Sequence, residues 1–136
     1  MISFKTPLIA KALDDGRSWV LHEPLIVDLG LPGKKDLLTI PKGFQTDFGS
    51  IPWWIPDWIA NPQGKAKRSF AMHDFLYRNQ LFTQLVDDAL LNEGMIVDGV
   101  NWFQRFTVYR GLRLGGWKTW NEYAKQEEIR QHGAIE

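Results

Sequence analysis

The sequence predicts an α+β fold, with a small antiparallel N-terminal sheet followed by a helical hairpin and C-terminal helices. Two observations support this prediction. Up to about residue 48 the chain consists of short β-prone runs broken by turn residues. From about residue 65 onward the apolar residues recur at helical spacing. A length of 136 residues is ordinary for one domain, so residues 1–136 are predicted to form a single domain.

The N-terminal segment, residues 1–48, is predicted to hold three or four antiparallel strands. Asp15-Gly16 favours a hairpin turn, because glycine tolerates a positive φ. Pro24 cannot donate a hydrogen bond to a neighbouring strand, so we expect it at an edge or a bulge. Residues 49–64 contain three tryptophans and three prolines. Because disordered linkers are poor in aromatic residues, this segment is predicted to be an ordered loop.

Four helices are predicted in the rest of the chain, over residues 65–80, 84–97, 101–116 and 117–131. Thr83 is expected to be the N-cap of the second helix, and Gly99 is expected to end it. The third helix has aromatic residues interspersed with arginines, a pattern typical of an amphipathic helix with a basic outer face. The arginines are Arg105, Arg110 and Arg113.

The composition argues against several classes of function. The chain has no cysteine, which excludes disulfides, thiolate metal sites and cysteine nucleophiles. Nothing therefore requires an oxidising compartment, and a reducing cytoplasm is the default expectation. Sixteen basic and sixteen acidic residues give zero net charge, which argues against broad nucleic-acid binding but leaves a local patch open. No apolar run approaches the roughly 20 residues of a transmembrane segment.

The strongest chemical signal is the run HDFLY that begins at His73. On a helix, His73 and Tyr77 lie one turn apart on the same face, and Asp74 is rotated by about 100° from His73. The three side chains can therefore serve different parts of one site. A purely structural alternative is a hydrogen-bonded pair of His73 and Tyr77 facing the core, with Asp74 paired to Arg78.

Asp88 lies on a largely apolar face of the second predicted helix. A carboxylate in such a place must be paired or shifted in pKa, and a helical hairpin could bring it against His73. The neighbouring Asp87 has a simpler explanation, because an acid in the first turn stabilises the helix dipole. The same explanation can apply to Asp88.

Asp47 and Ser50 lie in the segment TDFGSIP, between the predicted sheet and the predicted helices. Loop residues at the end of a strand commonly line a site. The alternative is a tight turn in which these side chains bind local backbone groups.

Together, one imidazole and three carboxylates predict either an oxygen-rich cation site or a His-carboxylate general base. Carboxylate ligands suit calcium, magnesium or manganese, and a histidine with two aspartates can also hold zinc. In the general-base interpretation, Asp88 fixes the tautomer of His73, which activates water. Asp47 or Asp74 then holds a cation that polarises a carbonyl group.

The order of these motifs resembles a family of small proteins of unknown function from bacteriophages and prophages, marked by Thr-Asp-Phe-x-Ser-Ile-Pro and His-Asp-x-Leu-Tyr. The similarity covers roughly residues 38–120. Gly49 departs from the pattern, in which alanine is expected. The residues that the resemblance selects are Asp47, Ser50, Pro52, His73, Asp74, Tyr77 and Asp88.

A second, more distant similarity concerns His73, Asp74, Tyr77 and the later Asp88. This arrangement is similar to the active-site helices of calcium-dependent secreted phospholipases. The resemblance implies that His73 is the base, that Asp74 binds calcium and that Asp88 orients the histidine. Those enzymes also have disulfides and a glycine-rich calcium loop, and this sequence has neither.

Two functions from different classes follow from these observations. The first is a virion-associated phage or prophage protein, associated with the tail, that is made in the cytoplasm of the bacterial host and docks other phage structural proteins through Trp53, Trp54 and Trp58. It carries a His/Asp metal or hydrolytic site or a cluster that only braces the fold. The alternative is a phage-encoded hydrolase that acts on a cell-envelope component with His73 as general base and a divalent cation, calcium or zinc.

Overall fold

The computed structural model describes residues 1–16, 18–30, 37–47 and 66–135. The described chain forms six short strands and then three helices, which confirms the predicted α+β class. The elements are β1 (Ser3–Phe4), β2 (Ala10–Ala12), β3 (Trp19–Leu21), β4 (Leu25–Asp28), β5 (Leu37–Ile40), β6 (Gln45–Thr46), α1 (Lys67–Asn79), α2 (Gln84–Val97) and α3 (Trp102–Ile135).

The described strands form two antiparallel sheets of three strands each, in the orders β1-β4-β5 and β2-β3-β6. In the first sheet Leu25 pairs with Ile40 and Val27 pairs with Leu38. These four side chains are buried, whereas Thr39 between two of them is exposed. The alternation arises because successive residues of a strand point to opposite faces of the sheet.

The predicted hairpin at Asp15-Gly16 is confirmed, because it joins the paired strands β2 and β3. Gly16 has a φ of 77°, which glycine adopts without a steric cost. The Asp15 carboxylate accepts a hydrogen bond from the backbone N–H of Ser18 at 2.7 Å. Pro24 lies between β3 and β4, outside the paired residues, where its missing N–H costs no ladder hydrogen bond.

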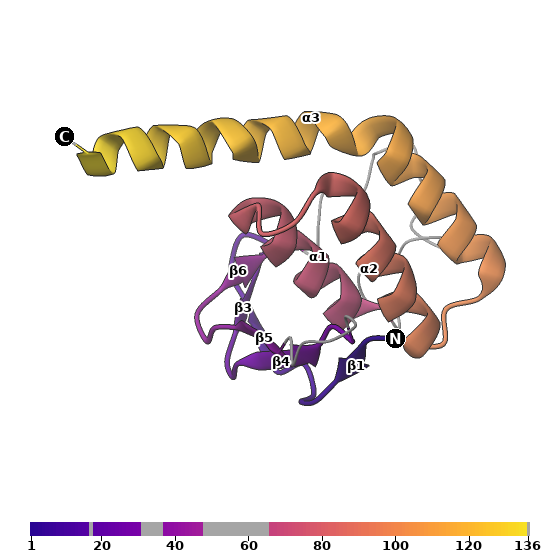
Figure 1. Ribbon diagram of the computed structural model, residues 1–136. Coiled ribbons are helices and arrows are strands. Elements are labelled where there is room, and N and C mark those ends of the chain that lie inside the picture. Colours follow the sequence, from indigo (N-terminus) through magenta and orange to yellow (C-terminus); the bar gives the residue numbers. More distant parts are fainter. Residues whose placement is uncertain (17, 31–36, 48–65, 136) are drawn as a thin grey trace.

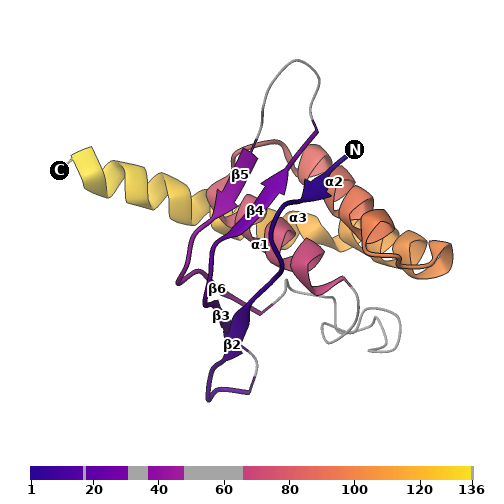
Figure 2. The ribbon, with the colours of Figure 1, turned by 90° about the horizontal axis from the view of Figure 1, so that it is seen from below.

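The strands lie on one side of α1 and α2, and α3 lies on the other side (Figure 1). The view from below shows β4 and β5 in front of the helices (Figure 2). One buried apolar core joins the sheets to all three helices. Its members include Leu21, Leu25, Val27 and Ile40 from the strands and Met72, Leu76, Leu91, Met95, Val108 and Leu112 from the helices.

The ends of α2 agree with the sequence prediction. The Thr83 hydroxyl accepts a hydrogen bond from the backbone N–H of Val86, and Gly99 follows the helix with a φ of 79°. Asp98 at the end of α2 accepts hydrogen bonds from Arg68 Nε and Ser69 Oγ, both at 2.5 Å. The start of α1 is thereby tied to the end of α2.

The structure corrects the prediction of separate third and fourth helices, because α3 runs without interruption from Trp102 to Ile135. Gly115 and Gly116, where the first of them was expected to end, lie inside it. Figure 1 shows that α3 bends near its middle and that its C-terminal half extends past the other helices. Packing of α3 on both α1 and α2 holds this glycine-containing stretch in a helix.

Gly94 in α2 allows α1 and α2 to approach each other closely. A Cβ atom at this position would lie 2.6 Å from Ser69 Oγ and 3.2 Å from Ile2 Cδ1. We therefore expect Gly94→Ala to lower the free energy of unfolding by about 1–3 kcal/mol, because the added methyl overpacks the contact. Urea denaturation gives this value directly.

Gly115 in α3 provides the matched control, because a Cβ there would meet no atom within 4 Å. Gly115→Ala is expected to stabilise the protein by up to about 1 kcal/mol through helix propensity alone. Equal effects of the two substitutions on the free energy of unfolding would show that the close approach at Gly94 does not contribute to stability.

Candidate functional site

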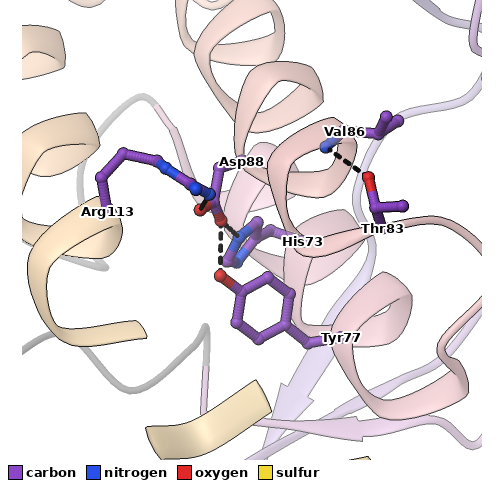
Figure 3. Close-up of polar contacts among 6 residues, drawn as sticks. All are labelled: His73, Tyr77, Thr83, Val86, Asp88 and Arg113. Atoms are coloured by element: carbon purple, nitrogen blue, oxygen red, sulfur yellow. Dashed lines mark hydrogen bonds and ion pairs between the residues drawn. The ribbon is translucent and has the colours of Figure 1, made fainter. Parts of the chain in front are cut away.

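The buried carboxylate of Asp88 is the centre of a polar cluster between the three helices. Its Oδ1 lies 2.9 Å from His73 Nε2 and accepts a hydrogen bond of 2.5 Å from the Tyr77 hydroxyl. Its Oδ2 accepts a hydrogen bond of 2.9 Å from Arg113 Nη1. Figure 3 shows the three side chains converging on the carboxylate. We call these four residues the Asp88 cluster.

Each member of the cluster is placed by its helix. His73 and Tyr77 lie one turn apart on α1, so both side chains point toward α2, as their spacing predicts. Their rings also contact each other, with centroids 4.1 Å apart. Arg113 reaches the same carboxylate from α3. The purely structural alternative for His73 and Tyr77 is correct in that both face the interior, but Asp88 is their shared partner.

The geometry fixes which ring nitrogen of His73 carries a proton. A carboxylate only accepts hydrogen bonds, so the Asp88 contact assigns a hydrogen to Nε2 of the histidine. In the neutral ring Nδ1 is then the basic nitrogen. The contact between Asp88 and His73 that the sequence suggested is therefore present, and the role of His73 as a base stays a prediction.

The interior also shifts the acidity of Tyr77. Burial raises the pKa of the Tyr77 phenol far above its usual value, and the hydrogen bond to Asp88 raises it further. Tyr77 is consequently a permanent hydrogen-bond donor to Asp88. The ring of Trp120 packs edge-on against Tyr77, with centroids 5.2 Å apart, and covers it from the side of α3.

The sequence prediction missed the contribution of α3 to the cluster. Arg113 was assigned to a basic outer face, but its guanidinium points inward to Asp88. Gly116 was taken as a helix end, whereas a Cβ at this position would lie 3.0 Å from the Tyr77 hydroxyl oxygen. An arginine and a small residue spaced three apart on one face were the available signal, and this signal is weak without knowledge of the neighbouring helix.

Asp74 belongs to a second group of contacts, which points away from Asp88. Its Oδ2 accepts a hydrogen bond of 2.7 Å from the Thr46 hydroxyl, and its Oδ1 accepts one of 3.1 Å from Arg78 Nε. Burial raises the pKa of Asp74, and the positive charge of Arg78 opposes that rise. The pairing of Asp74 with Arg78 is the one that the structural alternative predicts.

Asp47 is exposed next to Thr46, and its negative charge contributes to the raised pKa of Asp74. Within the ranges that the structure describes, no group of three or more His, Asp or Glu side chains is arranged to hold a metal ion. Asp47 and Asp74 as cation ligands therefore stay a prediction. The predicted residues Ser50, Trp53, Trp54 and Trp58, and the loop 49–64 as a whole, lie outside the described residues.

Asp87 is fully buried beside Asp88. Neither of its carboxylate oxygens has a hydrogen-bond partner in the described part of the chain. Burial raises the pKa of Asp87 to about 7, and the negative charge of Asp88 adds to the rise. The helix dipole, which was the predicted explanation for an acid at this position, is thus only part of its environment.

Removal of the Tyr77 hydroxyl tests the strength of the Asp88 cluster. Tyr77→Phe is expected to lower the free energy of unfolding by about 1.5–3 kcal/mol, because a hydrogen bond to a buried charged group is lost. Tyr109→Phe is the matched control, since Tyr109 lies on α3 outside the Asp88 cluster, and a change near zero is expected. Equal losses in urea denaturation would contradict the account.

Asp87 makes a specific pH dependence of stability testable. The folded protein binds its proton more tightly than the unfolded chain, so stability falls as pH rises from 3.8 to about 7 and then levels off. We therefore expect Asp87→Asn to be more stable than wild type by about 4 kcal/mol at high pH and equal to it at low pH, because each pKa unit corresponds to about 1.4 kcal/mol.

Asp14→Asn, a substitution of an exposed acid, serves as the control for this pH dependence. It is expected to leave the curve of unfolding free energy against pH unchanged. A constant difference between Asp87→Asn and wild type across the whole pH range would show that Asp87 does not titrate abnormally.

Comparison with known proteins identifies a family. The model of a family described as "Protein of unknown function (DUF1353)" matches residues 19–112, which is more than half of the chain. No curated protein and no solved structure matches. The matched segment contains His73, Asp74, Tyr77 and Asp88, and it ends one residue before Arg113. The chain therefore belongs to the DUF1353 family of proteins of unknown function.

Proposed function

We propose that this protein is a virion-associated component of a bacteriophage or prophage, associated with the tail, in which the Asp88 cluster braces the helical layer. The phage origin is supported by the TDFGSIP and HDFLY segments, which resemble motifs of small phage and prophage proteins. In this proposal the protein is made in the cytoplasm of the bacterial host and is then built into the particle.

The observation that carries the bracing role is the complete enclosure of Asp88. Its side chain is 0% exposed, and its two oxygens accept hydrogen bonds from α1 and α3. His73 is only 4% exposed. A buried carboxylate whose two oxygens are both paired favours one rigid packing of the helices around it. Such rigidity suits a component of an assembled particle.

The separation of Asp74 from the Asp88 cluster also supports the bracing role. Asp74 is occupied by Thr46 and Arg78, whereas His73 faces Asp88 on another side of α1. A cation held by Asp74 would therefore have to displace existing hydrogen bonds. The predicted contact with other phage structural proteins is the loop with Trp53, Trp54 and Trp58.

Fractionation of purified phage particles tests the proposal. Particles banded from a lysate of the encoding phage or induced prophage are expected to contain the chain, and separation of heads from tails should place it with the tails. Quantitative mass spectrometry measures both distributions against a known tail protein and a cytoplasmic host protein. A chain that stays with the cytoplasmic protein throughout would contradict the proposal.

A hydrolase that acts on a cell-envelope component is the second candidate, and the orientation of His73 favours it. Asp88 holds Nε2, which leaves Nδ1 as the nitrogen that could take a proton from water. In this candidate Asp88 and Tyr77 position the base, and Asp47 and Asp74 hold calcium or zinc.

Release of soluble products from isolated bacterial envelopes, with and without added calcium or zinc, tests this candidate. His73→Gln is expected to abolish release while the variant stays folded by circular dichroism. His22→Gln is the matched control, because His22 is an exposed histidine outside the Asp88 cluster. Equal release by both variants, or no release by wild type under any condition, would remove the hydrolase candidate.

A further inference from the structure

The first half of α3 carries a row of large apolar side chains that no other part of the described structure covers. Five of them are about half exposed or more, and we call them the α3 stripe. They are Trp102 at 65%, Phe103 at 52%, Phe106 at 47%, Leu114 at 73% and Trp117 at 50% exposure. An apolar patch of this kind on a folded protein commonly marks a binding surface.

The stripe has two parts, one on each side of the bend in α3. At 3.6 residues per turn, Trp102, Phe103 and Phe106 fall within an arc of about 100°, and Leu114 and Trp117 fall within an arc of about 60°. The buried residues Val108 and Leu112 lie on the opposite side, against the core. The first half of α3 is therefore apolar on two faces, one packed inside and the other turned outward.

Every charged side chain in the stretch of chain that carries the stripe is a cation. Between Asp98 and Glu122 the chain contains no carboxylate side chain and four cations, in a protein whose net charge is zero. The cations are Arg105, Arg110, Lys118 and Arg113, the last of which is bound to Asp88. Arg110 and Lys118 are exposed and lie over the rings of Phe106 and Trp117, within the stripe itself. A binding partner of the α3 stripe is therefore expected to carry negative charge next to apolar groups.

A second copy of the chain fits this requirement poorly. A two-fold contact brings the same surface of both subunits together. Two α3 stripes packed on each other would place cations such as Arg110 against each other, and residues 99–121 contain no carboxylate to pair with them.

Single-stranded nucleic acid also fits poorly, because it is bound by stacking bases on open aromatic faces. Here the rings of Trp102 and Phe106 stack on each other, with centroids 5.3 Å apart. Arg110 lies 5.5 Å from the centroid of Phe106, and Lys118 lies 5.6 Å from that of Trp117. These ring faces already have partners within the helix.

We propose that the α3 stripe docks on the surface of an anionic lipid bilayer, with this half of the helix lying in the plane of the interface. Tryptophan, phenylalanine and leucine side chains enter the headgroup region of a membrane, while flanking arginine and lysine side chains meet lipid phosphates. No helix in the described ranges is long and apolar enough to cross a membrane, and surface docking requires none. This inference is independent of the proposed role in a phage particle.

Co-sedimentation of the full-length protein with lipid vesicles tests the inference. Vesicles with equal parts of phosphatidylglycerol and phosphatidylcholine are expected to bind the protein and to shift its tryptophan emission to shorter wavelength. Vesicles of phosphatidylcholine alone are expected to bind at least tenfold more weakly. Added salt should weaken binding to the anionic vesicles, because it screens the attraction of the cations.

Substitutions on α3 separate the stripe from the rest of the helix. Leu114→Gln and Arg110→Gln are each expected to weaken binding to anionic vesicles severalfold, and the double variant at least tenfold. The matched controls are Ile129→Gln and Lys125→Gln, which change an exposed apolar and an exposed basic residue of α3 outside the stripe. They are expected to bind as wild type does, and circular dichroism checks that all variants are folded.

Several results would overturn the inference. These are no binding to anionic vesicles, equal binding to both vesicle types, or equal weakening by the stripe and control substitutions. Binding of a fluorescent oligothymidine without binding to vesicles would assign the surface to nucleic acid instead. A dimer that Leu114→Gln dissociates, with no vesicle binding, would assign it to a second copy of the chain.

Discussion

A carboxylate in the interior of a protein must be given hydrogen-bond donors, and Asp88 takes them from two other helices. The donors on α1 are His73 and Tyr77, and the donor on α3 is Arg113. The relative positions of the three helices are thereby linked, because a shift of α1 or α3 removes at least one donor from a buried charge. The apolar core supplies most of the driving force for folding, whereas the Asp88 cluster selects one arrangement of the helices among those that the core would allow.

Local signals made the first two helices predictable. Thr83 caps α2 with its own hydroxyl and Gly99 follows it in a left-handed conformation, and both effects depend only on neighbouring residues. The division of the strands into two sheets could not be predicted, because the pairing of β1 with β4 joins residues far apart in sequence. The single long α3 was missed for a related reason. Gly115 and Gly116 weaken a helix in isolation, and only the packing against α1 and α2 outweighs that tendency.

The candidate site was predicted in part, and the limit has a physical cause. A buried acid on an apolar helix face must find a partner, which is why Asp88 could be linked to His73 from the sequence. Arg113 is a long side chain at the border of an amphipathic helix, and such a side chain can point either to solvent or inward. The direction of the Arg113 side chain depends on where α3 crosses α2, and the local sequence does not predict that crossing. Asp74 was correctly expected to address a different direction from His73, because adjacent residues on a helix are about 100° apart.

The arrangement of the three helices depends most on the hydrogen bond by which Asp88 holds α3. A double-mutant cycle with Asp88→Asn and Arg113→Gln measures this link directly through the free energies of unfolding. A coupling energy of about 1 kcal/mol or more is expected, so that the two single losses do not add. A parallel cycle with Arg110→Gln, a solvent-exposed arginine of the same helix, should give a value near zero. A coupling near zero for Arg113 as well would show that the carboxylate does not hold α3, and would contradict the account.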